Sequence, residues 1–333
     1  MKHIIIGAGV AGITAAKTIK EIDKSAEVVV IGNERFFPYK RFLLTEFLCG
    51  SIKKEDLIYF PIESLKELGI KLRKGEYVKA VEPSEKAIKL FHNEVAHYDK
   101  LLITTGRSPD LGLVLRPYKK YIQRYYSMND ILVLKEKLPE IQKCIVYGEG
   151  LSSLDLICGL FNLGKQVTYI IRGTQADLAL KESELYGELH NFLKEKGIEI
   201  ITEDQIVSID KLNHHYRVET LKQKELTTDI VFAWDHYKPN ISCIEGTGIK
   251  KKLGILVNEC LETSHEDIYA AGDCVEIYHP GIKDYWINFG WPNAQEQGTI
   301  AGKNMLGQKE KYKIRETITF NLMGKSLKAR WWK

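Results

Sequence analysis

The chain has 333 residues, of which 44% are hydrophobic and 28% are charged, and its formal net charge is +4. This composition is typical of a globular protein with a sizeable core and excludes a disordered chain or a fibre. No apolar run approaches the roughly 18 residues that a membrane span needs, and the apolar start of the chain leads into a glycine-rich turn rather than a cleavage site. We therefore expect a cytoplasmic protein without a membrane span.

The first element is a short β-branched strand that enters the turn GAGVAG and continues as an alanine-rich helix up to residue 22. A second strand follows at residues 27–34, about twenty residues after the turn, as in a complete βαβ dinucleotide-binding unit. Gly7 permits the tight turn, Gly9 lets the backbone approach a pyrophosphate, and Gly12 allows the helix to pack on the strand. The helix N-terminus supplies N–H groups for the phosphates. Glu34, which follows the second strand slightly late, is the best candidate to bind the ribose hydroxyls.

A second unit of the same kind contains Gly148 and Gly150 between a strand and a helix. This copy is degraded, because Ser153 replaces the third glycine and Glu149 places a negative charge beside the expected pyrophosphate. Arg172 stands at the end of the following strand, where it weakly favours a 2′-phosphate or is simply a surface residue. Two such units in one chain predict two nucleotides held face to face.

The cysteines and histidines do not indicate a metal site. The six cysteines are scattered without any C-x-x-C pair, and the nine histidines are equally dispersed. We therefore expect reduced thiols and no zinc, iron–sulfur or dithiol centre.

Further blocks in the same order resemble one known family. Residues 98–110 look like the segment YDxLxxATG, and residues 263–276 are similar to T-S-x-x-x-I-Y-A-x-G-D. Residues 291–302 match W-x-x-A-x-x-Q-G-x-x-A-G. Together with the two glycine turns, these blocks resemble the FAD-dependent pyridine nucleotide–disulfide oxidoreductase superfamily along essentially the whole chain. Residues 38–50 resemble the PYxRPxL segment of NADH:rubredoxin oxidoreductases and of NADH nitrite reductase flavoproteins, with Phe42 in place of the usual proline.

The resemblance implies roles for individual residues. Asp273 holds the ribityl chain of the flavin, Arg41 lies near the isoalloxazine, the backbone at Val78 contacts adenine, and the helix beginning at Trp291 faces the pyrimidine edge of the flavin. Asp155 stands where the family has a glutamate that orients the nicotinamide, and its alternative role is a solvent-facing helix acid. The motifs and the resemblance together assign cofactor binding to Gly7, Gly9, Val10, Ala11, Gly12, Glu34, Arg35, Arg41, Val78, Thr105, Gly106, Arg107, Gly148, Gly150, Asp155, Gly272, Asp273, Trp291 and Ala294.

Two departures bear on the chemistry. The paired cysteines of disulfide reductases are absent, so the flavin itself is expected to be the redox centre. In residues 231–240 the glycine that lets the backbone pass the nicotinamide is missing, and Trp234 either blocks the nucleotide or stacks in its place.

The resemblance predicts an α/β protein with two Rossmann-like domains: an FAD domain of residues 1–110 and 241–303, and an inserted NAD(P)-binding-like domain of residues 111–240. Residues 304–333 are expected to be a truncated C-terminal interface segment, where relatives usually carry a further domain. This segment has a net charge of +6, which leaves −2 for the rest of the chain. Trp331 and Trp332 have the composition of an interface anchor, and a disordered end is the alternative.

The resemblance implies an FAD-dependent NAD(P)H oxidoreductase that passes electrons to a small acidic carrier such as a rubredoxin or a ferredoxin-like protein. The alternative is an FAD-containing relay or structural subunit of a larger redox complex, with a degenerate NAD site. Nucleic-acid binding through the basic segment is disfavoured, because the sequence shows no stacking platform or groove-reading motif.

Overall fold

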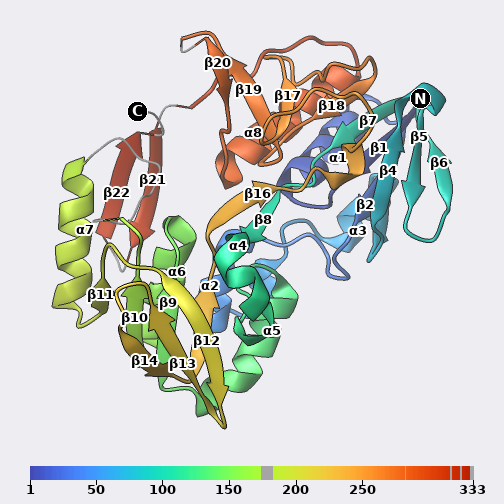
Figure 1. The fold of residues 1–333 in the computed structure, drawn as a ribbon. Helices are drawn as coiled ribbons and strands as arrows, with labels where there is room; N and C mark the ends of the chain where they lie inside the picture. Colours follow the sequence, from blue (N-terminus) through green and yellow to red (C-terminus); the bar gives the residue numbers. More distant parts are fainter. Residues whose placement is uncertain (174–182, 282, 316, 323–324, 331–333) are drawn as a thin grey trace. The chain divides into compact units, whose positions relative to one another are not determined.

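The computed structural model describes residues 1–173, 183–281, 283–315, 317–322 and 325–330. The chain divides into two compact units. The first unit consists of Met1–Lys40, Leu57–Ser108 and Lys238–Arg315, and the second of Arg41–Asp56, Pro109–Tyr237 and Glu316–Lys333. Each unit contains a parallel sheet that follows the βαβ pattern (Figure 1). The expected α/β class with two Rossmann-like units is therefore confirmed.

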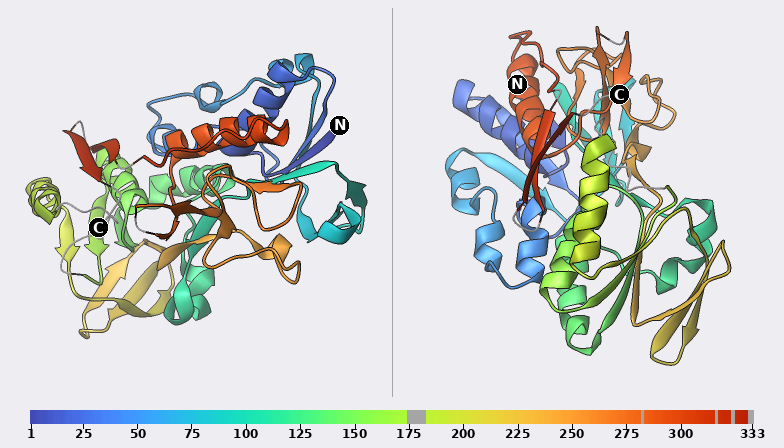
Figure 2. Two further views of the ribbon diagram at one scale, coloured as in Figure 1. Left: turned by 90° about the horizontal axis from the view of Figure 1, so that it is seen from above. Right: turned by 90° about the vertical axis from the view of Figure 1, so that its left-hand side faces the viewer.

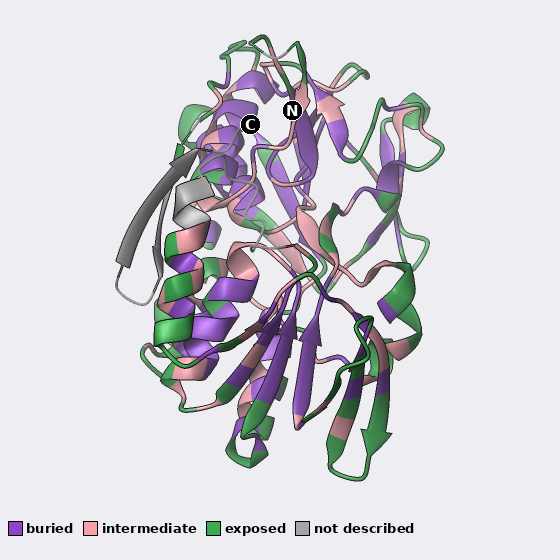
Figure 3. Cartoon of the chain, turned by 60° about the vertical axis from the view of Figure 1, so that its left-hand side comes forward, coloured by how far each residue is buried: buried purple, intermediate pink, exposed green. Residues whose placement is uncertain are grey.

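The first unit is built on a five-stranded parallel sheet in the order β18-β7-β1-β2-β3. Its central strands are β-branched runs that are buried on both faces, as a parallel sheet covered by helices requires (Figure 3). The strands are β1 (Lys2–Ile6), β2 (Glu27–Gly32), β3 (Ile70–Lys74), β7 (Lys100–Ile103) and β18 (Ile268–Ala270).

Helices α1 (Val10–Ile22) and α8 (Trp291–Met305) lie side by side in the first unit (Figures 1 and 2). Small residues bring them close together. A Cβ at Gly298 would overlap the Ala11 carbonyl oxygen, and a Cβ at Gly302 would lie 2.8 Å from the Ala15 carbonyl oxygen. This close packing holds α1 directly against α8.

The remaining elements of the first unit are smaller. They form a sheet in the order β4-β5-β6, a second sheet in the order β17-β19-β20, and one short helix. These elements are α3 (Ile62–Glu67), β4 (Val78–Glu82), β5 (Ala87–Leu90), β6 (Val95–His97), β17 (Ile255–Val257), β19 (Val275–His279) and β20 (Asp284–Trp286).

The second unit is built on a four-stranded parallel sheet in the order β11-β10-β9-β15. An antiparallel sheet, β12-β13-β14, and the hairpin of β21 and β22 complete its strands. The strands are β9 (Lys143–Tyr147), β10 (Gln166–Ile170), β11 (Glu199–Ile201), β12 (Ile206–Leu212), β13 (His215–Thr220), β14 (Glu225–Thr228), β15 (Ile230–Ala233), β21 (Thr317–Leu322) and β22 (Lys325–Arg330). The helices are α2 (Leu44–Leu48), α4 (Gly112–Leu115), α5 (Met128–Lys137), α6 (Leu151–Asn162) and α7 (Ser183–Glu195). Trp331 and Trp332 lie outside the described residues.

The chain passes from one unit to the other along β8 (Arg107–Asp110) and β16 (His236–Pro239), which pair with each other. Within the described ranges, no helix is long and apolar enough to cross a membrane. The same ranges contain no group of three or more histidine, cysteine, aspartate or glutamate side chains placed to hold a metal ion.

Replacing Asn304 with alanine should destabilise the first unit, because this buried amide joins the segment at Cys260 to the segment at Glu310. Asn304 donates hydrogen bonds to the carbonyl oxygens of Cys260 and Glu310 at 2.8 and 2.7 Å, and it accepts one from the Glu310 N–H at 2.6 Å. We expect Asn304→Ala to lower the free energy of unfolding by about 2–4 kcal/mol, because buried backbone groups lose their partners. Urea denaturation measures this loss, and Asn129→Ala, at an exposed helical position, is the matched control. Equal losses in both variants would contradict the prediction.

Candidate functional site

The turn after β1 is shaped by its glycines and by Thr104. Gly7 has a φ of +116°, and a Cβ there would overlap the Thr104 carbonyl oxygen. A Cβ at Gly12 would overlap the Gly7 carbonyl oxygen. The Thr104 hydroxyl donates hydrogen bonds to the carbonyl oxygens of Ile6 and Gly7, both at 3.0 Å. The turn is therefore packed so tightly on its inner side that only glycine fits at these two positions.

The outer side of the same turn is open. A Cβ at Gly9 would meet no atom within 4 Å. Gly9 is the N-cap of α1, no side chain caps the helix, and its first turn carries no acidic residue. The first N–H groups of the helix, including those of Val10 and Ala11, have no intrahelical partner. These features fit the pyrophosphate of a bound dinucleotide, which approaches backbone N–H groups at a positive helix end.

Other predicted residues lie at the same edge of the sheet, because parallel strands end on one side. Gly272 follows β18, and a Cβ there would lie 3.2 Å from the Ala11 Cβ and 3.8 Å from the Ala294 Cβ. Thr105 and Gly106 follow β7, the neighbour of both β1 and β18. The structure thus brings together residues that are more than 200 positions apart in the sequence.

Asp273 is held by two groups next to this edge. Its Oδ1 accepts a hydrogen bond from the Gly290 N–H at 3.0 Å, and its Oδ2 lies 3.3 Å from Arg107 Nε. The Arg107 guanidinium is also stacked over the Phe289 ring, 3.8 Å from its centroid. Asp273 is therefore fixed in orientation at the start of α8, where the side chain can accept a hydrogen bond from a ligand hydroxyl.

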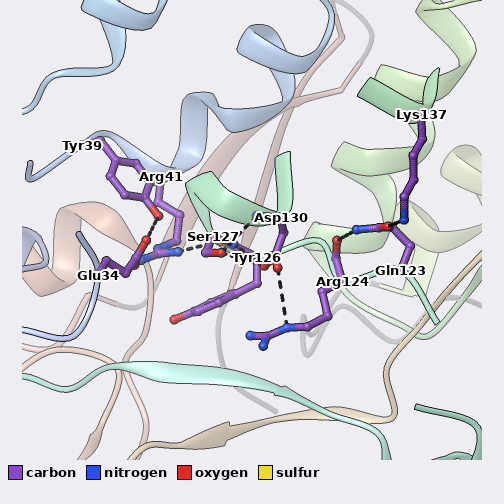
Figure 4. Close-up of polar contacts among 9 residues, drawn as sticks. All are labelled: Glu34, Tyr39, Arg41, Gln123, Arg124, Tyr126, Ser127, Asp130 and Lys137. Atoms are coloured by element: carbon purple, nitrogen blue, oxygen red, sulfur yellow. Dashed lines mark hydrogen bonds and ion pairs between the residues drawn. The ribbon is translucent and has the colours of Figure 1, made fainter. Parts of the chain in front are cut away.

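Glu34 and Arg35 follow β2, at the same edge of the sheet. Glu34 Oε2 accepts a hydrogen bond from the Tyr39 hydroxyl at 2.8 Å (Figure 4). Arg35 lies against Gly75, where a Cβ would be 3.1 Å from Arg35 Cγ. These carboxylate and guanidinium groups fit the polar surroundings of a ribose.

Val78 and Trp291 belong to two further elements of the first unit. Val78 begins β4 and is buried in the core. Trp291 is the first residue of α8, and its ring meets the Tyr59 ring edge-on with centroids 4.9 Å apart. The Tyr59 hydroxyl is in turn 2.8 Å from the Thr14 hydroxyl of α1. Tyr59 therefore links the starts of the two helices that border the candidate dinucleotide site.

The second dinucleotide turn, after β9, repeats the first with different side chains. Gly148 has a φ of +127°, and a Cβ there would overlap the Trp234 carbonyl oxygen. Trp234 thus takes the place that Thr104 has beneath Gly7. Its side chain is 2% exposed, and a Cβ at Gly148 would lie 3.0 Å from ring atom Cδ1 and 3.1 Å from Nε1, so the ring is part of the core and packs against the turn. Ser153, in the position of the third glycine, is fully buried and donates a hydrogen bond to the Gly148 carbonyl oxygen at 2.8 Å.

The outer side of the second turn is open, as in the first. Gly150 is the N-cap of α6, and a Cβ there would meet no atom within 4 Å. No acidic residue stands in the first turn of α6. Glu149 accepts a hydrogen bond from the Gly173 N–H at 3.1 Å, which occupies its carboxylate at the end of β10. These residues fit the pyrophosphate of a second dinucleotide.

Arg172 and Asp235 form an ion pair at the ends of β10 and β15. Arg172 Nη1 lies 2.6 Å from Asp235 Oδ1. Asp235 Oδ2 is also 3.3 Å from His236 Nδ1. Arg172, for which the sequence left open a weak preference for a 2′-phosphate or a simple surface position, is therefore paired with a carboxylate of the chain itself.

Asp155 lies on α6, and its carboxyl group joins a hydrogen-bond network within the second unit. Its Oδ2 accepts hydrogen bonds from the hydroxyls of Thr45 and Tyr125, the latter at 3.3 Å. The residue keeps an exposed surface, yet the surrounding protein displaces enough water that desolvation raises the pKa of Asp155 to about 6. An exposed residue whose carboxyl group is poorly solvated is typical of a functional position.

Arg41 is held in the second unit by Tyr126. Its Nη1 donates a hydrogen bond to the Tyr126 carbonyl oxygen at 2.5 Å, and its guanidinium lies over the Tyr126 ring, 4.4 Å from the centroid (Figure 4). The next residue, Ser127, caps α5 in a reciprocal capping box with Asp130. The loop that holds Arg41 is therefore anchored by the start of a helix.

Sequence reasoning missed Thr104, Thr45 and Tyr125. Thr104 was detectable, because it precedes the predicted Thr105 in the block that carries the resemblance. Thr45 lies in the segment around Arg41, but nothing in its neighbours indicates a contact with Asp155. Tyr125 has no sequence signal, since it stands in a segment between motifs.

Comparison with known proteins places the chain in a family. The family model described as pyridine nucleotide-disulphide oxidoreductase matches residues 1–298. The chain belongs to this family. The expected resemblance is therefore confirmed, and the chain is an oxidoreductase by family.

Individual members of the pyridine nucleotide-disulphide oxidoreductase family show how far the similarity extends. The NADH-rubredoxin oxidoreductase of Clostridium acetobutylicum is 29% identical over 317 residues, which cover 93% of this chain and 76% of that protein. The assimilatory nitrate reductase electron transfer subunit of Bacillus subtilis is 28% identical over 274 residues, covering 82% of this chain and 36% of that protein. The solved structure of a covalent putidaredoxin reductase–putidaredoxin complex matches with a TM-score of 0.88 at 20% identity, over 96% of this chain and 78% of that chain, and supports the fold.

Proposed function

We propose that the chain is an FAD-dependent NAD(P)H oxidoreductase that passes electrons to a small carrier protein. The observation that carries this proposal is the pair of dinucleotide turns. Each has a tightly packed inner side and an open outer side at the start of a helix. FAD, when bound, supplies the chemistry that converts a two-electron hydride into single electrons.

The proposal assigns one nucleotide to each part of the chain. Residues 1–110 and 241–303 are the FAD-binding domain, residues 111–240 the NAD(P)-binding domain, and residues 304–333 an interface segment. In the FAD domain, Gly7 to Gly12 hold the pyrophosphate, Glu34 binds a ribose and Asp273 binds the ribityl chain. In the NAD(P) domain, Gly148 and Gly150 hold the pyrophosphate. The remaining predicted residues keep the roles that the family resemblance implies.

The proposed acceptor is a small acidic protein of the rubredoxin or ferredoxin type, in the cytoplasm. A relative that matches 93% of this chain is named NADH-rubredoxin oxidoreductase. The net charge of +6 on residues 304–333 favours encounter with an acidic carrier, because complementary charges raise the rate of association.

A second candidate function is an FAD-containing relay or structural subunit of a larger redox complex. The ion pair of Arg172 with Asp235 favours it, because it occupies an arginine beside the second turn. A relative named as an electron transfer subunit of nitrate reductase is consistent with this alternative.

Anaerobic titration of the FAD-loaded protein with NADH and then NADPH tests the proposal. We expect either nucleotide to bleach the visible absorption of the flavin within the mixing time. A flavin that stays oxidised with both nucleotides but bleaches with dithionite would contradict the proposal and favour the relay subunit. A protein that cannot be loaded with FAD would contradict both.

Replacing Asp235 with asparagine should raise the affinity for NADPH relative to NADH. The substitution frees Arg172 to bind a 2′-phosphate without competition from the carboxylate. Because Arg172 is 47% exposed, the ion pair is partly screened, and we expect a change of about threefold in the ratio of dissociation constants. Asp210→Asn, which removes the partner of Arg217 on an exposed hairpin, is the matched control. An unchanged ratio in Asp235→Asn would show that Arg172 does not meet the ribose.

A further inference from the structure

Three side-chain oxygens from separate parts of the second unit meet at one point. The hydroxyls of Thr45 on α2 and Tyr125 in the loop before α5 both contact Oδ2 of Asp155 on α6, and they also contact each other. Thr45 is 6% exposed and Tyr125 is 7% exposed, whereas Asp155 keeps an exposed surface. Both contacts to Asp155 use Oδ2. The cluster therefore joins two buried hydroxyls to the carboxyl group of an exposed residue.

This arrangement accommodates Asp155 with or without a proton. When the carboxyl group is ionised, the hydroxyls of Thr45 and Tyr125 both donate to Oδ2. When Oδ2 carries a proton, it donates that proton to the Tyr125 hydroxyl, and Tyr125 then donates to Thr45. No heavy atom has to move between the two states. Burial raises the pKa of Tyr125 well above its usual range, so Tyr125 keeps its proton throughout.

The surroundings favour the neutral form of Asp155. Desolvation raises the pKa of Asp155 to about 6, and the negative charge of Glu46 on α2 acts in the same direction. The hydrogen bonds from Thr45 and Tyr125 lower this pKa, so they oppose the effect of desolvation. Tyr237 also raises the pKa of Tyr125, and the charge of Asp155 in turn helps to raise the pKa of the Cys49 thiol, which lies near Lys135.

We propose that Asp155 is a protonation site that controls binding of the nicotinamide dinucleotide, and that Thr45 and Tyr125 are the residues that position it. The neutral carboxyl group accepts the nucleotide, and the ionised group disfavours it. This inference rests on the proposed function, which places the nucleotide at the start of α6, one helical turn before Asp155.

The direction of the effect follows from charge and solvation. NAD⁺ is an anion overall, because its pyrophosphate carries two negative charges and its nicotinamide ring only one positive charge, and the bound nucleotide also removes water from Asp155. Both effects disfavour a carboxylate at this position. Nucleotide binding and proton binding at Asp155 therefore support each other, and the affinity for the nucleotide falls as the pH rises through the range in which Asp155 titrates.

Calorimetric titration of the FAD-loaded protein with NAD⁺ measures this linkage without hydride transfer. Between about pH 5 and pH 8 we expect the dissociation constant to rise by up to about tenfold per pH unit once Asp155 ionises, as linkage to one proton requires. Asp155→Asn cannot ionise, and its dissociation constant should lose this component of the pH dependence. An Asp155→Asn protein with the same pH profile as the wild type would overturn the proposal.

The positioning role of Thr45 and Tyr125 can be tested without a nucleotide, from the pH at which Asp155 titrates. Carbon-13 NMR of the aspartate carboxyl groups reports the titration of Asp155, which is assigned by its loss in Asp155→Asn. Removing a donor destabilises the carboxylate, so Thr45→Val and Tyr125→Phe should shift the midpoint to higher pH. Thr45→Ser keeps the hydroxyl and should restore the wild-type midpoint, and Tyr121→Phe, outside the network, should leave it unchanged.

The calorimetric titration and the NMR titration together distinguish failure of this inference from failure of the proposed function. A midpoint in the ordinary range of aspartate, or one that Thr45→Val and Tyr125→Phe do not move, would overturn the inference even if NAD⁺ binds. Absence of NAD⁺ binding at every pH, with a flavin that NADH does not reduce, would overturn the proposed function and with it the control of binding by Asp155.

Discussion

Replacing Gly12 with alanine is expected to unfold the turn after β1 and to abolish FAD binding. A Cβ at this position would overlap the Gly7 carbonyl oxygen and would lie 2.7 Å from the Thr104 hydroxyl. Both are held in place by the sheet, because Thr104 bonds to β1 and Gly7 bonds to the Ile31 carbonyl oxygen. The steric overlap of the new Cβ can therefore be relieved only by a shift of the backbone, which we expect to lower the free energy of unfolding by at least about 3 kcal/mol. Urea denaturation of the apoprotein and fluorescence titration with FAD measure the two effects.

Gly9→Ala separates the role of the turn in folding from its role in binding. Gly9 has a φ of −78°, and a Cβ there meets no protein atom within 4 Å. We therefore expect the apoprotein to keep its stability within about 1 kcal/mol. The added methyl group enters the space in front of the helix N-terminus, so FAD affinity should fall at least about tenfold. Gly187→Ala, at a helical position where a Cβ also meets nothing, is the matched control. Undiminished FAD affinity in Gly9→Ala would exclude a pyrophosphate at this turn.

Acidification is expected to destabilise the first unit through His3. His3 lies on β1, is fully buried, and has no hydrogen-bond partner for either ring nitrogen among the described residues. Burial lowers the pKa of His3 from 6.5 to about 4. Below pH 6.5 the unfolded chain binds a proton at His3 that the folded chain does not, so stability is lost as the pH falls from 6.5 to about 4. The full loss from this one group is about 3 kcal/mol.

His3→Leu isolates this contribution, because every other titrating group is common to both proteins. The difference in free energy of unfolding between His3→Leu and the wild type should grow by about 3 kcal/mol between pH 7 and pH 4 in favour of the variant. His92→Gln, at an exposed position, is the matched control. Parallel profiles for His3→Leu and the wild type would show that His3 takes up a proton in the folded state.

The local sequence patterns were sufficient to predict both βαβ units and the helix that begins at Trp291. Gly7, Gly12 and Gly148 were predicted as turn glycines, and all three occupy positions where a Cβ would overlap a carbonyl oxygen. The prediction succeeded because these constraints act between residues of one turn or between strands whose order the motif implies. Trp234 was harder to interpret. Its replacement of a smaller residue was visible, but its place in the core beneath Gly148 depends on how β15 ends beside β9.

The amino-acid sequence by itself determined the family, the α/β class and the positions of the two dinucleotide turns, because glycine spacing and strand–helix periodicity act over short stretches of chain. Only the tertiary structure decided which side chains meet around those turns. Asp155 has Thr45 as a partner 110 residues away and Tyr125 as a partner 30 residues away. Arg172 pairs with Asp235, 63 residues further along the chain. Such contacts depend on the packing of elements that are distant in the sequence, and no local pattern records that packing.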